Sequence, residues 1–545
     1  RRFLVHMVAV VLIPLSVFAQ NAMDPLLLGD GDRLLVPAPH PDDETLAAGG
    51  LIQEALLLDL PVQVCFFTLG ANNELAALFS RRPPLRIPGA VRGLDAIRRN
   101  EALAAAAQLG LDPLHVIFLG YPDSATLDIW TRHWRDTPPY RSASSRQSSV
   151  PYEDALSPGA AFSGEDILED IETVLRDFRP TLVVLPHPAD HNPDHRALYL
   201  FTQIALWNLE PEGFSPRLLA YPLHFTQWPD PRLFQPLRPA FAPYFLRDAA
   251  DWSEFELAPF QVSNKLAAIQ RHASQYRLAF AGLDAHARKS ELFSTIPPLR
   301  LPGGLGDAEA IDEDPSRFRP DDAMLQALSA QSGDGASIVR QIEAESRELA
   351  GHDNTYSRLA VSGDGRRLSL AFEFQEPLSP SAALAVQAFG YRTDTPFGQM
   401  PKLEIRTVPG RAVSVADLAS PLPASSVDLA FPDDHTLVLE IPFGLLGQPD
   451  KILVGSQLAS DTLPIDGLPW RVIDLSGAPP STPLPPPTAR RTPPADAPPA
   501  DAPPAPAADL PAAPEPAPPA PLTPRVRIPR KTLPERSEAN EPVLW

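Results

Sequence analysis

Residues 39–44 read Pro39-His40-Pro41-Asp42-Asp43-Glu44, and they come just after the apolar run Leu34-Leu35-Val36. The apolar run predicts a buried strand over residues 33–37, and the segment after the motif predicts a helix over residues 43–59. The motif therefore lies on the turn where a strand ends, which is where open α/β sheets bind their ligands. A purely structural role, with one carboxylate capping the helix, explains only one of the four polar side chains.

Short apolar segments alternate with helical segments along the first two hundred residues. This alternation predicts an α/β fold, with a Rossmann-like parallel sheet and helices on both faces. The predicted strands are 33–37, 61–69, 114–119 and 181–186, and the predicted helices are 43–59, 93–109, 165–177 and 195–208.

A second polar cluster follows the predicted strand at 181–186. It reads Pro186-His187-Pro188-Ala189-Asp190-His191-Asn192-Pro193-Asp194-His195. Loops that leave parallel strands meet at one edge of a sheet, so this cluster would face the first motif. His40 and Asp43 can converge on one cation, and the second cluster can supply the third protein ligand that a catalytic zinc needs. Asp42 lies between two predicted ligands and could accept a proton from water without binding the metal.

At these residues the chain resembles the PIG-L/LmbE family of zinc-dependent N-acetylglucosaminyl deacetylases. The family pattern is His-Pro-Asp-Asp-Glu early in the chain and an Asp-His pair after a later strand. The resemblance covers about residues 31–295 and includes further matching segments. These are Arg98-Arg99-Asn100-Glu101, Leu119-Gly120-Tyr121-Pro122-Asp123 and Asp194-His195-Arg196.

The resemblance implies a role for each matching residue. The implied roles are zinc ligand for His40, Asp43 and His195, general base for Asp42, and substrate contact for Arg98 and Asp123. One position departs from the family pattern, since many members carry a histidine three residues before the second zinc-binding histidine and this chain has Asn192. An asparagine side chain can donate to an oxyanion, and His191 is adjacent, so both residues are candidates for that role.

The sequence supports two functional hypotheses, an enzyme and a binding protein. The main hypothesis is an exported zinc-dependent hydrolase that removes acetyl groups from N-acetylated amino sugars or glycans. A zinc hydrolase that acts on another amide would keep the same site. The alternative is a carbohydrate-binding envelope protein with an inactive deacetylase-like domain, and the asparagine at the oxyanion position motivates it.

The composition limits the kinds of partner and of metal site. The chain has 545 residues, enough for two or three domains. Its net charge of −21 argues against a nucleic-acid partner, because phosphate binding needs a basic face. Cys65 is the single cysteine, so metal ligands must be His, Asp or Glu. Because Cys65 lies in an apolar run, we predict a buried strand residue rather than a reactive thiol.

The segments outside the first domain have distinct compositions. Residues 1–20 predict a signal peptide, and hence a periplasmic or secreted protein without a stable membrane span after cleavage. The alternative is an uncleaved N-terminal anchor. Residues 296–335 predict a connector, and 476–545 predict a disordered Pro/Ala-rich tail. Residues 338–475 predict a β-sandwich, which is either carbohydrate-binding-like or packs on the catalytic domain and binds nothing. The aromatic-rich segment 124–163 predicts either a lid over a sugar or an ordered insertion that packs its own aromatic side chains.

Overall fold

The computed structural model describes residues 23–70, 93–301, 309–311 and 356–475. These ranges exclude 143–144, 226–227, 244–245, 247–249, 277–281, 364–365, 375–376, 379–381, 409, 412 and 461–462. The described residues belong to one compact unit, Arg1–Thr488. The predicted signal peptide and the predicted tail lie outside the described residues. Within the described part of the chain, no helix has the length and apolarity to span a bilayer.

Eight described strands form the sheet of the first half, in the order β1-β7-β8-β6-β5-β2-β3-β4. The five strands from β6 to β4 run parallel, which confirms the predicted parallel sheet. Strand β8 pairs antiparallel with both β6 and β7, an edge that the sequence patterns do not predict. The strands are β1 (Asp24–Pro25), β2 (Leu34–Ala38), β3 (Val62–Thr68), β4 (Val116–Tyr121), β5 (Leu182–Pro186), β6 (Arg217–Tyr221), β7 (Asp251–Glu256) and β8 (Ser290–Thr295).

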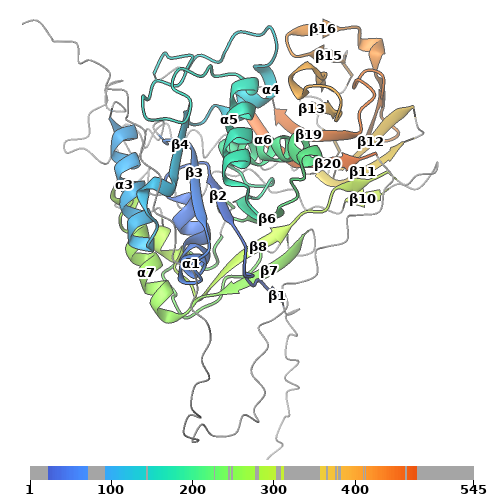
Figure 1. Ribbon diagram of the computed structural model, residues 1–545. Helices are drawn as coiled ribbons and strands as arrows, with labels where there is room; N and C mark the ends of the chain where they lie inside the picture. Colours follow the sequence, from blue (N-terminus) through green and yellow to red (C-terminus); the bar gives the residue numbers. More distant parts are fainter. Residues whose placement is uncertain are drawn as a thin grey trace, which may run out of the picture. The chain divides into compact units, whose positions relative to one another are not determined.

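Helices cover both faces of this sheet (Figure 1), as predicted. Successive side chains of a strand point to opposite faces, so Leu34 and Val36 enter the core under α1, α3 and α7. Leu35 enters the core under α4, α5 and α6. The α-helices are α1 (Asp43–Leu57), α3 (Leu94–Leu109), α4 (Thr126–Arg132), α5 (Gly164–Phe178), α6 (Pro193–Leu209), α7 (Pro259–Ile269) and α8 (Ala273–Tyr276). Short 3₁₀ helices are η1 (Pro113–His115), η2 (Glu210–Glu212), η3 (Leu283–His286), η4 (Phe397–Gln399) and η5 (Ala424–Ser426).

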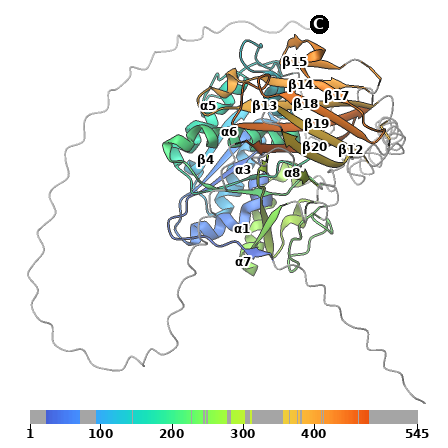
Figure 2. The ribbon, with the colours of Figure 1, turned by 90° about the vertical axis from the view of Figure 1, so that its right-hand side faces the viewer.

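Two further sheets form the predicted β-sandwich, drawn in yellow to orange in Figure 2. Their strand orders are β10-β11-β12-β18-β17 and β16-β15-β14-β13-β19-β20-β9, and alternate residues of both sheets share one apolar core. The strands are β9 (Leu299–Arg300), β10 (Glu309–Ile311), β11 (Tyr356–Gly363), β12 (Arg367–Phe374), β13 (Ala382–Tyr391), β14 (Lys402–Thr407), β15 (Ser414–Asp417), β16 (Ser420–Leu422), β17 (Asp428–Ala430), β18 (Thr436–Pro442), β19 (Lys451–Ser460) and β20 (Leu463–Asp474).

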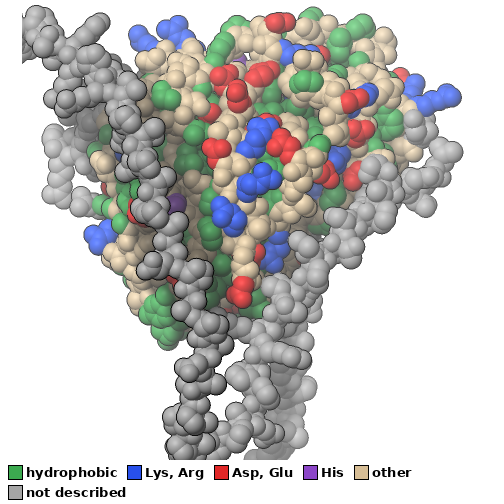
Figure 3. All heavy atoms as spheres, in the orientation of Figure 1, with side chains coloured by type: hydrophobic (Ala, Val, Ile, Leu, Met, Phe, Trp, Pro, Cys, Tyr) green, Lys and Arg blue, Asp and Glu red, His purple; other side chains and the backbone are tan. Residues whose placement is uncertain are grey.

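The two short strands β9 and β10 fall within the predicted connector at 296–335. Strand β9 pairs with β20, and β10 pairs with β11. Both strands therefore belong to the sandwich sheets, and the rest of residues 302–335 lies outside the described part. On the molecular face seen in Figure 3, acidic side chains lie among basic ones.

Candidate metal centre

Two loops at the carboxyl ends of β2 and β5 bring His40, Asp43 and His195 together. The two strands are neighbours in the sheet, and their loops lead into α1 and α6. Asp43 Oδ2 lies 3.1 Å from His40 Nδ1 and 3.0 Å from His195 Nε2. All three side chains are buried. The structure therefore brings the three predicted ligands into one cluster, although they span much of the first domain.

This cluster fits a zinc ion. Two imidazoles and one carboxylate are donors that zinc accepts, and donors bound tetrahedrally at about 2.0–2.1 Å lie about 3.3 Å apart. The two separations from Asp43 Oδ2 are close to that value, and the ligand atoms of the three residues all lie within 4.8 Å of one another. Three protein ligands are the number found in catalytic zinc sites.

Each histidine of the cluster has its second ring nitrogen beside another buried carboxylate. His40 Nε2 lies 3.1 Å from Asp194 Oδ2, and His195 Nδ1 lies 3.1 Å from Asp190 Oδ2. Such contacts fix the orientation of metal-binding histidines and make them better donors. The structure thus places Asp190 beside His195 and Asp194 beside His40.

The carboxylates make the cluster strongly attractive to positive charge. Burial alone would lower the pKa of His40, but hydrogen bonds to Asp123, Asp194 and Asp43 raise it well above its ordinary value. Burial also opposes protonation of His195, yet Asp190 and Asp43 raise its pKa to about 9. A site that stabilises a proton in this way also suits a metal cation, which competes with protons for the same nitrogens.

Asp42 has an unusual backbone at the start of α1. Its φ is 136° and its ψ is −30°, a conformation that costs a residue other than glycine about 1–3 kcal/mol. The Asp42 amide donates to Glu44 Oε2 at 3.1 Å. The Asp42 carbonyl accepts from the amides of Thr45 and Leu46 at 3.0 and 2.9 Å. These bonds hold the strained residue beside the predicted ligand Asp43.

Arg98 holds the Asp42 side chain. Arg98 Nη2 donates to Asp42 Oδ1 at 3.2 Å and to the Pro41 carbonyl at 2.7 Å, and Nη1 donates to the Gly70 carbonyl at 3.0 Å. Burial raises the pKa of Asp42, and the guanidinium of Arg98 opposes that rise. Arg98 is only 4% exposed. The structure thus shows Arg98 as a partner of Asp42, and its role as a substrate contact stays a prediction.

The other predicted residues border the cluster. Asp123 Oδ1 lies 3.3 Å from His40 Nε2. Asn192 caps α6, since its Oδ1 accepts from the Asp194 amide at 2.8 Å. The His191 ring packs edge-on against Phe225, with 5.6 Å between ring centroids, and burial lowers its pKa to about 4. The oxyanion role stays a prediction for both His191 and Asn192.

Two histidines outside the predicted set lie beside the site. The His224 ring stands perpendicular to that of His195 at 4.4 Å between centroids, and its Nδ1 lies 3.5 Å from Asp190 Oδ1. His272 Nε2 lies 3.4 Å from Glu44 Oε1. His224 follows the end of the parallel strand β6, and this position in the sequence indicates a residue at the ligand-binding edge of the sheet.

Comparisons with known proteins agree on the same part of the chain. The family model "PIG-L: GlcNAc-PI de-N-acetylase" matches residues 35–206. A 1D-myo-inositol 2-acetamido-2-deoxy-alpha-D-glucopyranoside deacetylase of Mycobacterium sp. (strain KMS) is 31% identical over 186 residues, which cover 32% of this chain and 52% of the relative. The enzyme of that name from Gordonia bronchialis is 33% identical over 178 residues, covering 32% of this chain and 56% of the relative.

The chain therefore spans about half the length of these curated relatives. Among solved structures, N,N'-diacetylchitobiose deacetylase from Pyrococcus horikoshii is similar with a TM-score of 0.29 and 19% identity. That match covers 48% of this chain and 83% of the other.

Proposed function

Because residues 35–206 form a domain of the PIG-L family, we propose that this protein is an exported, zinc-dependent deacetylase of N-acetylated amino sugars or glycans. One observation carries the proposal: the buried cluster of His40, Asp43 and His195 has Asp42 next to it in the chain. The names of the curated relatives, which are deacetylases of an acetamido sugar, support the same substrate class. Export follows from the predicted signal peptide.

The side chains divide the work of amide hydrolysis. His40, Asp43 and His195 would hold the zinc ion, which when bound lowers the pKa of a water molecule and polarises the amide carbonyl. Asp42 accepts a proton from the attacking water, as a general base. Protonated Asp42 then gives this proton to the leaving amine when the C–N bond breaks, so the products are acetate and a free amino group. Arg98 keeps the Asp42 carboxylate oriented throughout.

Charge that develops on the carbonyl oxygen needs a donor. His191 and Asn192 are the two candidates, because they end the loop that leads into α6, and the first turn of α6 carries the predicted ligand His195. Preorganised donors of this kind lower the barrier by stabilising the oxyanion. Asp123 and Arg98 are proposed to contact the sugar.

Acetate release from a panel of N-acetylated sugars and glycans tests this proposal. We expect release by the purified protein, loss of release after treatment with a chelator, and recovery on addition of zinc. Asp42→Asn should retain zinc and lose turnover by about 10²- to 10⁴-fold, the usual contribution of a general base. Full activity of Asp42→Asn would remove Asp42 from its role. Glycan binding without any acetate release would instead support the carbohydrate-binding alternative.

A further inference from the structure

One face of the seven-stranded sandwich sheet packs against the α/β domain. Ala388, Ile452 and Ile473 of β13, β19 and β20 point into the core of the sandwich. Their neighbours in the chain point the other way, and Phe389, Leu453 and Val472 join or pack against the core formed by α4, α5 and α6. Figure 1 shows these three strands beside these helices. The outward face of this sheet is therefore an internal surface of the protein.

Trp130 of α4 is at the centre of this contact. Its side chain has no exposed surface, and its ring stacks on Phe397 at 5.3 Å between centroids. The rings of Phe389 and Trp470 lie 5.7 and 5.9 Å away. On its other side Trp130 meets Phe201 of α6, edge-on at 5.0 Å. The Trp130 ring is enclosed by protein and has no surface left to contact a sugar.

The helix that carries Trp130 depends on these contacts. Helix α4 has only seven residues, and isolated helices of that length are not stable in water. Just beyond its end, Arg135 forms a two-pronged ion pair with Asp417 of the sandwich, Nη1–Oδ2 3.1 Å and Nη2–Oδ1 2.5 Å. The sandwich therefore holds α4 both through the aromatic side chains and through this ion pair.

The first turn of α4 in turn holds the metal centre. Thr126 donates to Asp194 Oδ1 through its amide at 3.1 Å and its hydroxyl at 2.5 Å. The Ser124 amide donates to Asp194 Oδ2 at 2.6 Å. The same oxygen lies 3.1 Å from His40 Nε2. A continuous series of contacts thus runs from Phe397 through α4 and Asp194 to the predicted ligand His40.

We propose that the β-sandwich is a structural part of the catalytic unit, and that Phe397 and Trp130 are positioning residues for His40. The proposal rests on the zinc site proposed above. A sandwich held in this way by buried aromatic side chains positions the metal ligand through α4. Carbohydrate binding by the sandwich does not account for this aromatic surface, whereas packing on the α/β domain does.

Phe397→Ala in the full-length protein tests the proposal, with Phe372→Ala as the matched control. Phe372 is equally buried, but it lies on β12 in the core of the sandwich, which is distinct from the core that contains α4. We expect Phe397→Ala to weaken zinc binding by about tenfold, the low end for loss of an outer contact to a metal ligand. We also expect faster hydrogen exchange of the α4 amides. Phe372→Ala should lower the melting temperature and leave zinc affinity unchanged.

Phe397→Leu serves if the alanine variant does not fold, and it should show the same two changes at smaller size. A folded Phe397 variant with wild-type zinc affinity and wild-type exchange of α4 would overturn the proposal. Equal loss of zinc affinity in Phe372→Ala would overturn it as well. Failure of the wild-type protein to bind zinc would instead refute the proposed function, and the exchange of α4 would still test the contact between sandwich and helix.

Discussion

Two buried carboxylates, Asp194 and Asp190, orient the histidines of the candidate metal centre. Asp194 accepts hydrogen bonds from Ser124 and Thr126 as well as facing His40. Asp190 accepts from the amides of Asn192 and His224 while facing His195. Each aspartate is therefore fixed by the backbone before it orients a histidine, which makes it unsuited to replacement by an amide.

We predict that Asp194→Asn and Asp190→Asn each weaken zinc binding by about 10- to 100-fold, the range seen when such outer partners are changed. The reason is that an amide cannot stabilise the charge that a metal-binding imidazole shares with its partner. Competition with a chromogenic chelator measures the affinity. Asp170→Asn is the control, because Asp170 is buried but pairs with Tyr121 and Ser157 away from the cluster. Equal affinities for all three variants would rule out this role.

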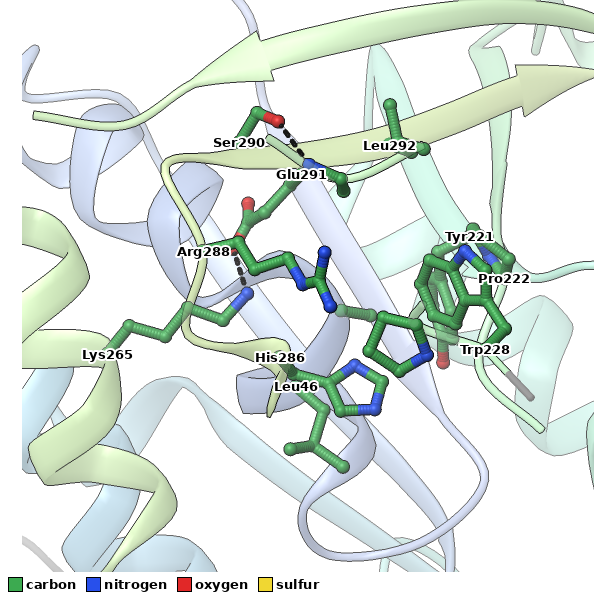
Figure 4. Close-up of a pocket in the computed structure, with 13 residues that line it drawn as sticks. Leu46, Tyr221, Pro222, Trp228, Lys265, His286, Arg288, Ser290, Glu291 and Leu292 are labelled. Carbon is green, nitrogen blue, oxygen red and sulfur yellow. Dashed lines mark hydrogen bonds and ion pairs between the residues drawn. The ribbon is translucent and has the colours of Figure 1, made fainter. Parts of the chain in front are cut away.

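Helix α1 is one element whose details need distant residues. The helix is interrupted at Ala48, where φ is −131° and ψ is 15°. Glu291 of β8 accepts from the Gly50 amide at 2.6 Å and the Leu51 amide at 2.9 Å, so it caps the second half of the helix. Lys265 Nζ lies 2.6 Å from the same carboxylate, as Figure 4 shows.

Helix α1 shows which parts of the fold the sequence predicts and which it does not. The apolar periods place β2 and α1 to within a few residues, since local patterns determine both elements. Gly49 and Gly50 weaken the helix locally just after Ala48, but the carboxylate that caps its second half is 241 residues away in the chain. A β-carbon at Gly50 would come within 2.5 Å of the Leu257 side chain, a contact that the sequence does not reveal either.

The same limit applies to the site. The two strand-end motifs predict the cluster around His40, because polar residues after parallel strands share one edge. The partner of each histidine depends on how the loops turn, so the sequence pattern does not reveal that Asp190 lies at His195 and Asp194 at His40. Trp130 and Phe397 come from separate domains, and no sequence pattern in either segment predicts their contact.

At the scale of this element, we predict that Glu291→Gln lowers the free energy of unfolding by about 3 kcal/mol or more, the cost of leaving a buried charge without its partner. Lys265 is 1% exposed and would be that charge. Denaturation by urea measures the effect. Asp128→Asn, which breaks the exposed pair with Arg132, should cost less than about 1 kcal/mol. Similar losses in the two variants would contradict the prediction.

For the whole molecule, stability depends on pH because folding lowers the pKa of some buried histidines and raises that of others. His187 lies under the ring of Trp252, nearly parallel at 6.2 Å between centroids, and its Nδ1 accepts from the Ala189 amide at 3.0 Å. Burial lowers its pKa to about 3. The unfolded chain binds a proton at this residue near pH 6.5, so its contribution to stability is present above pH 6.5 and is lost as pH falls toward 3.

His187→Asn isolates this contribution, because the amide oxygen can replace Nδ1 as acceptor. Between pH 7.5 and 5.5 we expect the wild-type protein to lose roughly 1 kcal/mol more free energy of unfolding than the variant, as proton linkage requires. The histidines with raised pKa, such as His195, act in the opposite direction, but they are common to both proteins and cancel in the comparison. Exposed His115 provides the control, since His115→Asn should follow the wild-type dependence. If His187→Asn shows the wild-type dependence too, His187 is not buried in its neutral form.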